Sequence, residues 1–143
     1  MIEIKLEHLG NNTMYEKSLQ VLEKICDDFN IVNQFGTLSM FNQMVCDYLK
    51  DSVSNFSVDI EYQISDDEVS MNYYLTGGSF EKLSSDNTGE NTVLFVMQRL
   101  SDELQFSSDN MQLTSSFHVK TKFTAINRSV NTTVVKSEKR VDA

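Results

Sequence analysis

Apolar and polar residues follow regular periods along most of the first 120 residues. Ile2, Ile4 and Leu6 alternate with polar residues, which predicts a first strand with one buried face. Apolar residues then recur at helical spacing in two blocks. The first block predicts a helix that ends near Asn30, and the second predicts a helix over about 37–53 with a broad apolar stripe.

The period changes back to two after the second helix. Residues 56–62 and 69–75 each alternate between apolar and polar, and the acidic turn 65–68 separates them. Two such runs joined by a short polar turn predict an antiparallel hairpin. A polar loop over 77–90 follows the hairpin.

The stretch 91–106 reads NTVLFVMQRLSDELQF and predicts a third helix that leads into a strand. Asn91 or Thr92 starts the helix, and Leu104 and Phe106 resume the strand period. Residues 111–119 predict a last strand, which residues 123–126 extend. The order of elements predicts an α+β two-layer sandwich, with a mixed, mostly antiparallel sheet and about three helices on one face.

Length and charge narrow the function classes. The 143 residues suit one domain, which we place at 1–126, followed by a polar C-terminal tail at 127–143. A net charge of −9 argues against nucleic acid as a partner. No apolar run reaches the length of a membrane span, and the first residues lack a secretion signal, so we expect a cytoplasmic protein that does not bind membranes. Cys26 and Cys46 are expected to be buried, and no metal-binding spacing is present.

The third helix carries a resemblance to a known family. Leu94, Val96, Met97, Leu100, Asp102, Glu103 and Leu104 match, in register, the last helix and following strand of the histidine-kinase-type (GHKL, or Bergerat) ATPase domain. The match is to the version in small anti-sigma-factor serine kinases. The resemblance covers roughly residues 1–120 and implies the same α+β layout.

Gln43 and Asp47 lie one turn apart on the second predicted helix. Their spacing alone favours a half-exposed polar face. The resemblance places Gln43 at the family's general-base glutamate and Asp47 at its magnesium-binding asparagine. A glutamine amide does not accept a proton at neutral pH, so Gln43 removes the base. Asp47 would bind a metal only if a nucleotide were bound.

The remaining nucleotide motifs are also altered. The resemblance places Leu75 at the aspartate that recognises adenine, with Thr76 as a substitute acceptor and Gly77 at the next glycine. Gly77 and Gly78 equally fit a tight turn at the end of a strand. In the phosphate loop only Gly89 remains near its place, and Asn91 and Val93 stand where the family has glycines.

These substitutions predict a vestigial nucleotide pocket with no catalytic residue and no cofactor. We expect a regulatory, anti-sigma-like or partner-switching protein without kinase activity. The resemblance implies a sigma factor or an anti-sigma antagonist domain as partner, and a homodimer. Phe80 and Leu83, apolar residues in the polar loop, are candidates for partner binding, and packing against the domain's own core explains them equally well. Two alternatives remain: a weak serine/threonine kinase that uses Mg-ATP, and a structural or oligomerisation domain with no ligand.

Overall fold

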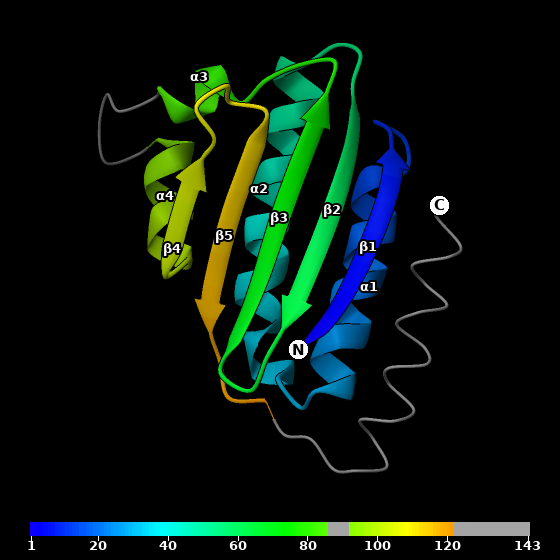
Figure 1. The fold of residues 1–143 in the computed structure, drawn as a ribbon, viewed down its shortest axis with the longest axis vertical. Coiled ribbons are helices and arrows are strands. Elements are labelled where there is room, and N and C mark those ends of the chain that lie inside the picture. The colour runs from blue at the N-terminus through cyan, green and yellow to red at the C-terminus, as the bar shows by residue number, and fades with distance from the viewer. Residues whose placement is uncertain (86–91, 122–143) are drawn as a thin grey trace.

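The protein folds as an antiparallel sheet with helices on one face (Figure 1). The structure, a computed structural model, describes residues 1–85 and 92–121. The elements are β1 (Ile2–Leu9), α1 (Met14–Asp28), the 3₁₀ helix η1 (Val32–Gln34), α2 (Phe35–Ser52), β2 (Ser57–Ile64), β3 (Glu68–Thr76), α3 (Glu81–Ser84), α4 (Val93–Leu100), β4 (Glu103–Phe106) and β5 (Gln112–His118). The strands lie in the order β1-β2-β3-β5-β4.

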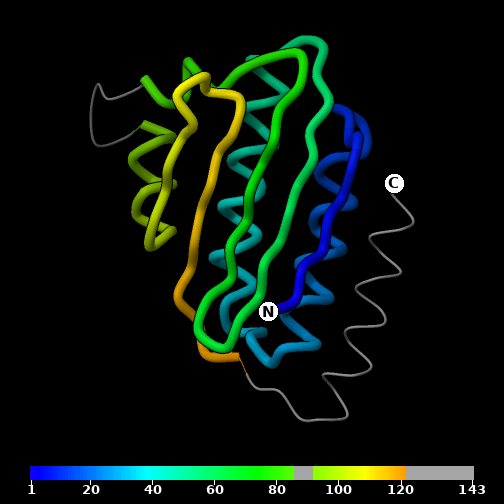
Figure 2. Tube along the Cα trace, in the orientation of Figure 1, coloured from blue at the N-terminus to red at the C-terminus, as the bar shows by residue number. Residues whose placement is uncertain are grey.

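This architecture confirms the predicted α+β two-layer sandwich. All strand pairs between the described residues are antiparallel, so the mostly antiparallel sheet that we expected contains no parallel pair in this part of the chain. Figure 2 shows how the chain leaves β3, forms α3, α4 and β4 at one side, and returns as β5 beside β3. The expected extension over 123–126 and the tail at 127–143 lie outside the described residues.

Helix α4 corresponds to the third helix that the sequence predicts, and it begins and ends close to the predicted residues. The Thr92 side chain accepts a hydrogen bond from the Phe95 backbone N–H at 3.1 Å, which caps the start of α4. Asp102, one of the residues that carry the family resemblance, accepts a hydrogen bond from the His118 backbone N–H at 2.6 Å. This bond ties the turn after α4 to the end of β5. No helix within the described ranges is long and apolar enough to cross a membrane.

The core lies between the helices and the inner face of the sheet. On β2 the burial alternates strictly, with Val58, Ile60, Tyr62 and Ile64 turned inward and fully buried. Strand geometry places their neighbours on the opposite face, which none of the described helices covers (Figure 1). The period-two pattern of the sequence therefore gives the sheet one apolar and one polar face.

A buried polar network joins the two helices to the sheet. The Asn42 side chain of α2 donates to Ser18 Oγ of α1 at 2.8 Å and accepts from the Tyr73 hydroxyl of β3 at 2.8 Å. All three side chains are completely buried. Burial raises the pKa of Tyr73 well above its ordinary value, so the hydroxyl remains a donor. Because each partner would be costly to bury alone, the network fixes α1, α2 and β3 relative to one another.

Replacing Tyr73 by Phe should therefore lower stability more than the same change at Tyr74. The Tyr73→Phe change leaves Asn42 Oδ1 buried without its donor, at a cost of about 1–3 kcal/mol in the free energy of unfolding. Tyr74 is half-buried on the opposite face and donates to Glu61 at 3.4 Å, so Tyr74→Phe should cost no more than about 0.5 kcal/mol. Urea denaturation measures both. Equal losses would contradict the role of the network.

Candidate functional site

A groove between α2 and α4 is the candidate site. It encloses about 310 Å³ and is lined by Met44, Asp47, Tyr48, Asp51, Ser52 and Val93. The five residues from α2 recur at helical spacing, so they form one stripe along that helix. Val93 is the first residue of α4 and is 44% exposed, so its side chain is available to a ligand.

Tyr48 forms the link between the groove and the loop after β3. Its hydroxyl donates to the Ser79 carbonyl oxygen at 3.0 Å. Its ring stacks on Phe80, with 5.9 Å between the ring centroids. Partial burial raises the pKa of the Tyr48 hydroxyl above its ordinary value. The wall of the groove is therefore held in place by both polar and aromatic contacts.

The structure brings together some of the residues that the sequence singles out. Asp47 and Val93 line the same groove although 46 positions separate them in the chain. Gln43 is exposed and is not part of the lining. Leu75 is buried in the core, and Thr76 is exposed on the opposite face of β3, so neither lines the groove. Gly89 and Asn91 lie outside the described residues.

Gly77 and Gly78, at the end of β3, are explained by backbone conformation and close packing. Gly77 has a φ of +87°, and a Cβ there would lie 2.8 Å from the Asn55 carbonyl oxygen. A Cβ on Gly78 would clash with Val53 Cγ1. Both positions pack against the connection between α2 and β2. The tight-turn explanation of these glycines is therefore sufficient, and they need no phosphate ligand.

The charges of the groove oppose phosphate binding. Two carboxylates, Asp47 and Asp51, contribute to the lining, and no basic side chain among the described residues does. Among the described residues, no group of three His, Cys, Asp or Glu side chains is placed to hold a metal ion. A cavity with an apolar wall and an acidic rim instead fits a cationic group with an apolar stem, such as a lysine or arginine side chain.

Phe80 and Leu83, our candidates for partner binding, are buried. Phe80 is 0% exposed and Leu83 is 3% exposed. Phe80 packs between Tyr48 and Phe106, with 6.2 Å between the centroids of the two phenylalanine rings. Both side chains thus complete the domain's own core. Their burial favours the packing alternative over an interface role, because a partner has no direct access to them.

The two cysteine thiols are buried and unreactive at neutral pH. Burial raises the pKa of Cys26 to about 11 and that of Cys46 to about 12. Both thiols therefore remain protonated at neutral pH, and the thiolate is the reactive form. The expectation that the two cysteines are buried is confirmed.

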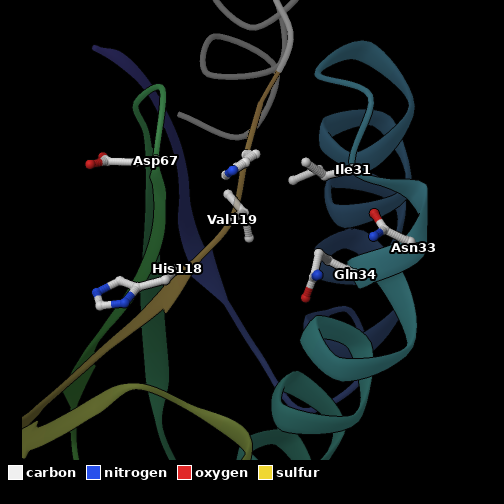
Figure 3. Close-up of a pocket in the computed structure, with 7 residues that line it drawn as sticks. Ile31, Asn33, Gln34, Asp67, His118 and Val119 are labelled. Carbon is white, nitrogen blue, oxygen red and sulfur yellow. The ribbon is translucent and has the colours of Figure 1, made fainter.

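A larger cavity lies at the other end of α2 (Figure 3). It encloses about 570 Å³ and is lined by Ile31, Asn33, Gln34, Asp67, His118, Val119 and Lys120. The side chains of Asp67 and His118 point away from Ile31 and Gln34. The polar groups therefore do not converge on one point, and the groove between α2 and α4 is the stronger candidate.

The turn at Gly77 supplies a stability test. Gly77→Ala forces a side chain into a left-handed conformation and against Asn55, so it should destabilise the protein by about 1–3 kcal/mol. Gly36→Ala is the matched control, because a Cβ at this helical glycine meets nothing within 4 Å. The control should be neutral or stabilising by up to about 1 kcal/mol. Thermal unfolding of both variants measures the difference, and a tolerated Gly77→Ala would refute the strained turn.

Comparison with known proteins finds no family model that matches the chain and no curated relative.

Proposed function

We propose that this chain is a regulatory protein-binding module of the anti-sigma or partner-switching type, without kinase activity. The observation that carries the proposal is the lining of the groove between α2 and α4. It combines the apolar side chains Met44, Tyr48 and Val93 with the carboxylates Asp47 and Asp51. Such a groove binds a basic segment of a partner protein through buried apolar contact and charge-assisted hydrogen bonds.

The residues at the family's nucleotide-binding positions and the charge of the groove argue against nucleotide chemistry. Leu75 is buried where the resembled family has its adenine acceptor, and a lost acceptor costs roughly 1–3 kcal/mol of binding. Val93 adds a β-branched side chain where the family has a glycine that approaches phosphate. The carboxylates of Asp47 and Asp51 repel the triphosphate. Three independent features thus oppose the kinase alternative.

Two further observations support the class of protein. The order of elements that the family resemblance implies agrees with the observed order, apart from the short helices η1 and α3. The net charge of −9 favours a basic partner surface. A sigma factor or an anti-sigma antagonist domain is the partner that the resemblance implies, and a homodimer is the assembly that it implies.

The proposal predicts that calorimetry with Mg-ATP or Mg-ADP shows no binding tighter than the high micromolar range. The reason is the missing adenine acceptor together with the acidic groove. Asp47→Ala provides the discriminating variant. A low-micromolar dissociation constant that is lost in Asp47→Ala would establish the kinase alternative, with Asp47 as the metal ligand.

A second prediction concerns the partner. Reversing the charge of the groove with Asp47→Lys and Asp51→Lys should abolish capture of the specific partner in pull-downs from native cells, with quantification by mass spectrometry. The matched control is Glu23→Lys with Asp27→Lys, an equally spaced acidic pair exposed on α1. The control should retain the partner, and capture by the unmodified protein should weaken with salt.

Two outcomes would count against the groove. Retention of the partner by the folded Asp47→Lys and Asp51→Lys variant would place the interface elsewhere. Equal loss in both charge-reversed proteins would show that overall acidity, and not this groove, attracts the partner.

A further inference from the structure

The face of the sheet opposite the helices is polar and acidic. This outer face is the one that the described helices leave uncovered (Figure 1). It presents the side chains that alternate with the core residues on the five strands. Its acidic members are Glu3, Glu7, Asp59, Glu61, Glu68 and Glu103. Against these carboxylates stand Lys5 and the exposed imidazole of His118.

Most polar groups at the centre of the outer face satisfy one another. Ser70 donates to Gln63 Oε1 at 3.2 Å, and Gln63 donates to Glu61 Oε1 at 3.3 Å. Tyr74 donates to the same Glu61 oxygen at 3.4 Å. These bonds join β2 to β3 and leave the carboxylate of Glu61 as a shared acceptor.

Two polar atoms on this face lack a partner. Within the part of the chain that the structure describes, Asn72 Oδ1 and Ser116 Oγ are buried without a hydrogen bond, and each residue is 6% exposed. Asn72 on β3 stands opposite Thr114, and Ser116 on β5 stands opposite Ser70, so the two are diagonal neighbours. Both oxygen atoms are able to accept a hydrogen bond, and leaving a buried acceptor without one costs free energy. A hydrogen-bond donor placed at the centre of the outer face would therefore be stabilised by these two oxygen atoms.

The carboxylates around these atoms favour a cationic donor. Glu61 stands directly opposite Asn72 on β2, and Glu103 stands directly opposite Ser116 on β4. A lysine or arginine side chain would reach an unsatisfied acceptor and a carboxylate together. A second copy of the same acidic face would bring like charges together, which argues against a face-to-face dimer.

The chain itself contains a segment of suitable charge. Residues 122–143 hold five basic side chains, Lys122, Arg128, Lys136, Lys139 and Arg140, and two acidic ones, Glu138 and Asp142. The remainder, 1–121, holds the other seven basic and nineteen acidic side chains. The acidic body and the basic C-terminal segment are thus of opposite sign.

The segment starts at one end of the sheet. It follows Thr121, whose backbone N–H donates to the Asp66 carbonyl oxygen at 3.0 Å in the turn between β2 and β3. Its 22 residues span up to about 70 Å when extended, whereas the nine residues of β3 span about 30 Å. The length therefore suffices to reach Asn72, Ser116 and the carboxylates beside them.

We propose that residues 122–143 bind across the acidic outer face of the same molecule, and that their lysine and arginine side chains donate to Asn72 Oδ1, Ser116 Oγ and the neighbouring carboxylates. This contact is independent of the groove between α2 and α4, since it uses the other face of the sheet.

Zero-length carbodiimide cross-linking of the full chain tests the contact. Equal amounts of ¹⁴N- and ¹⁵N-labelled protein separate cross-links within one chain from those between chains. Intramolecular links from Lys136 or Lys139 should concentrate on Glu61, Glu103 and Asp59. They should weaken when the salt concentration rises from about 0.05 M to about 0.5 M. Links between chains only would assign the face to a second copy and overturn the proposal.

A variant pair tests the two unsatisfied atoms. Asn72→Ala with Ser116→Ala should lower the yield of the intramolecular links to Glu61 and Glu103 several-fold. The matched control, Thr76→Ala with Gln105→Ala, removes polar groups from the same face and should leave the yield unchanged. Circular dichroism verifies that both variants fold. Unchanged yields in both variants, or links spread equally over Asp47, Asp51 and the α1 carboxylates, would refute specific docking on this face.

Discussion

The arrangement of the whole domain depends on the hydrogen bonds of one buried amide, that of Asn42. Its donor contacts Ser18 on α1 and its acceptor contacts Tyr73 on β3, so a single side chain joins both helices to the sheet. Apolar contacts alone tolerate small shifts between layers, whereas a buried hydrogen bond requires its partners at a defined distance. The network therefore sets the rotation of α2 about its axis.

That rotation determines which residues α2 offers to a ligand. With Asn42, Cys46 and Leu49 turned toward the core, helical geometry turns Gln43 and Asp47 outward. Asp47 then lies beside the start of α4, whereas Gln43, one turn earlier, is outside the groove. The site is thus a consequence of core packing. A substitution that rotates α2 would change the groove without altering any residue that lines it.

Sequence periodicity was sufficient to predict most of the elements, because burial on one face imposes a period of two or 3.6. It could not predict Asn42 and Ser18 as core residues, since the hydrogen bonds of the Asn42 amide reach residues 24 and 31 positions away in the chain. Phe80 and Leu83 pose the opposite problem. Both are buried, and Phe80 packs against Tyr48 and Phe106, which the tertiary fold brings to the loop.

The candidate site was predictable in part. The family resemblance singles out Asp47 and Val93, and both line the same groove in the structure. The resemblance places Leu75 at the adenine-binding aspartate and offers Thr76 as the substitute acceptor. Strand alternation sends these two side chains to opposite faces, so a shift of one residue in register does not exchange them. Asp51 and Met44 were missed, although their spacing from Asp47 on the same helix is a signal that would have found them.

The groove and the outer face both attract basic groups, so charge alone does not distinguish them. Their apolar content does. The groove contains Met44, Tyr48 and Val93, whereas Tyr74 is the one large apolar-bodied side chain among the described outer-face positions. A partner whose basic residues alternate with apolar ones gains buried area only in the groove. A segment rich in Ser, Thr and Asn, such as 127–137, gains hydrogen bonds on the outer face and little in the groove. On these grounds the two proposed contacts can coexist on one acidic domain without competing for the same ligand.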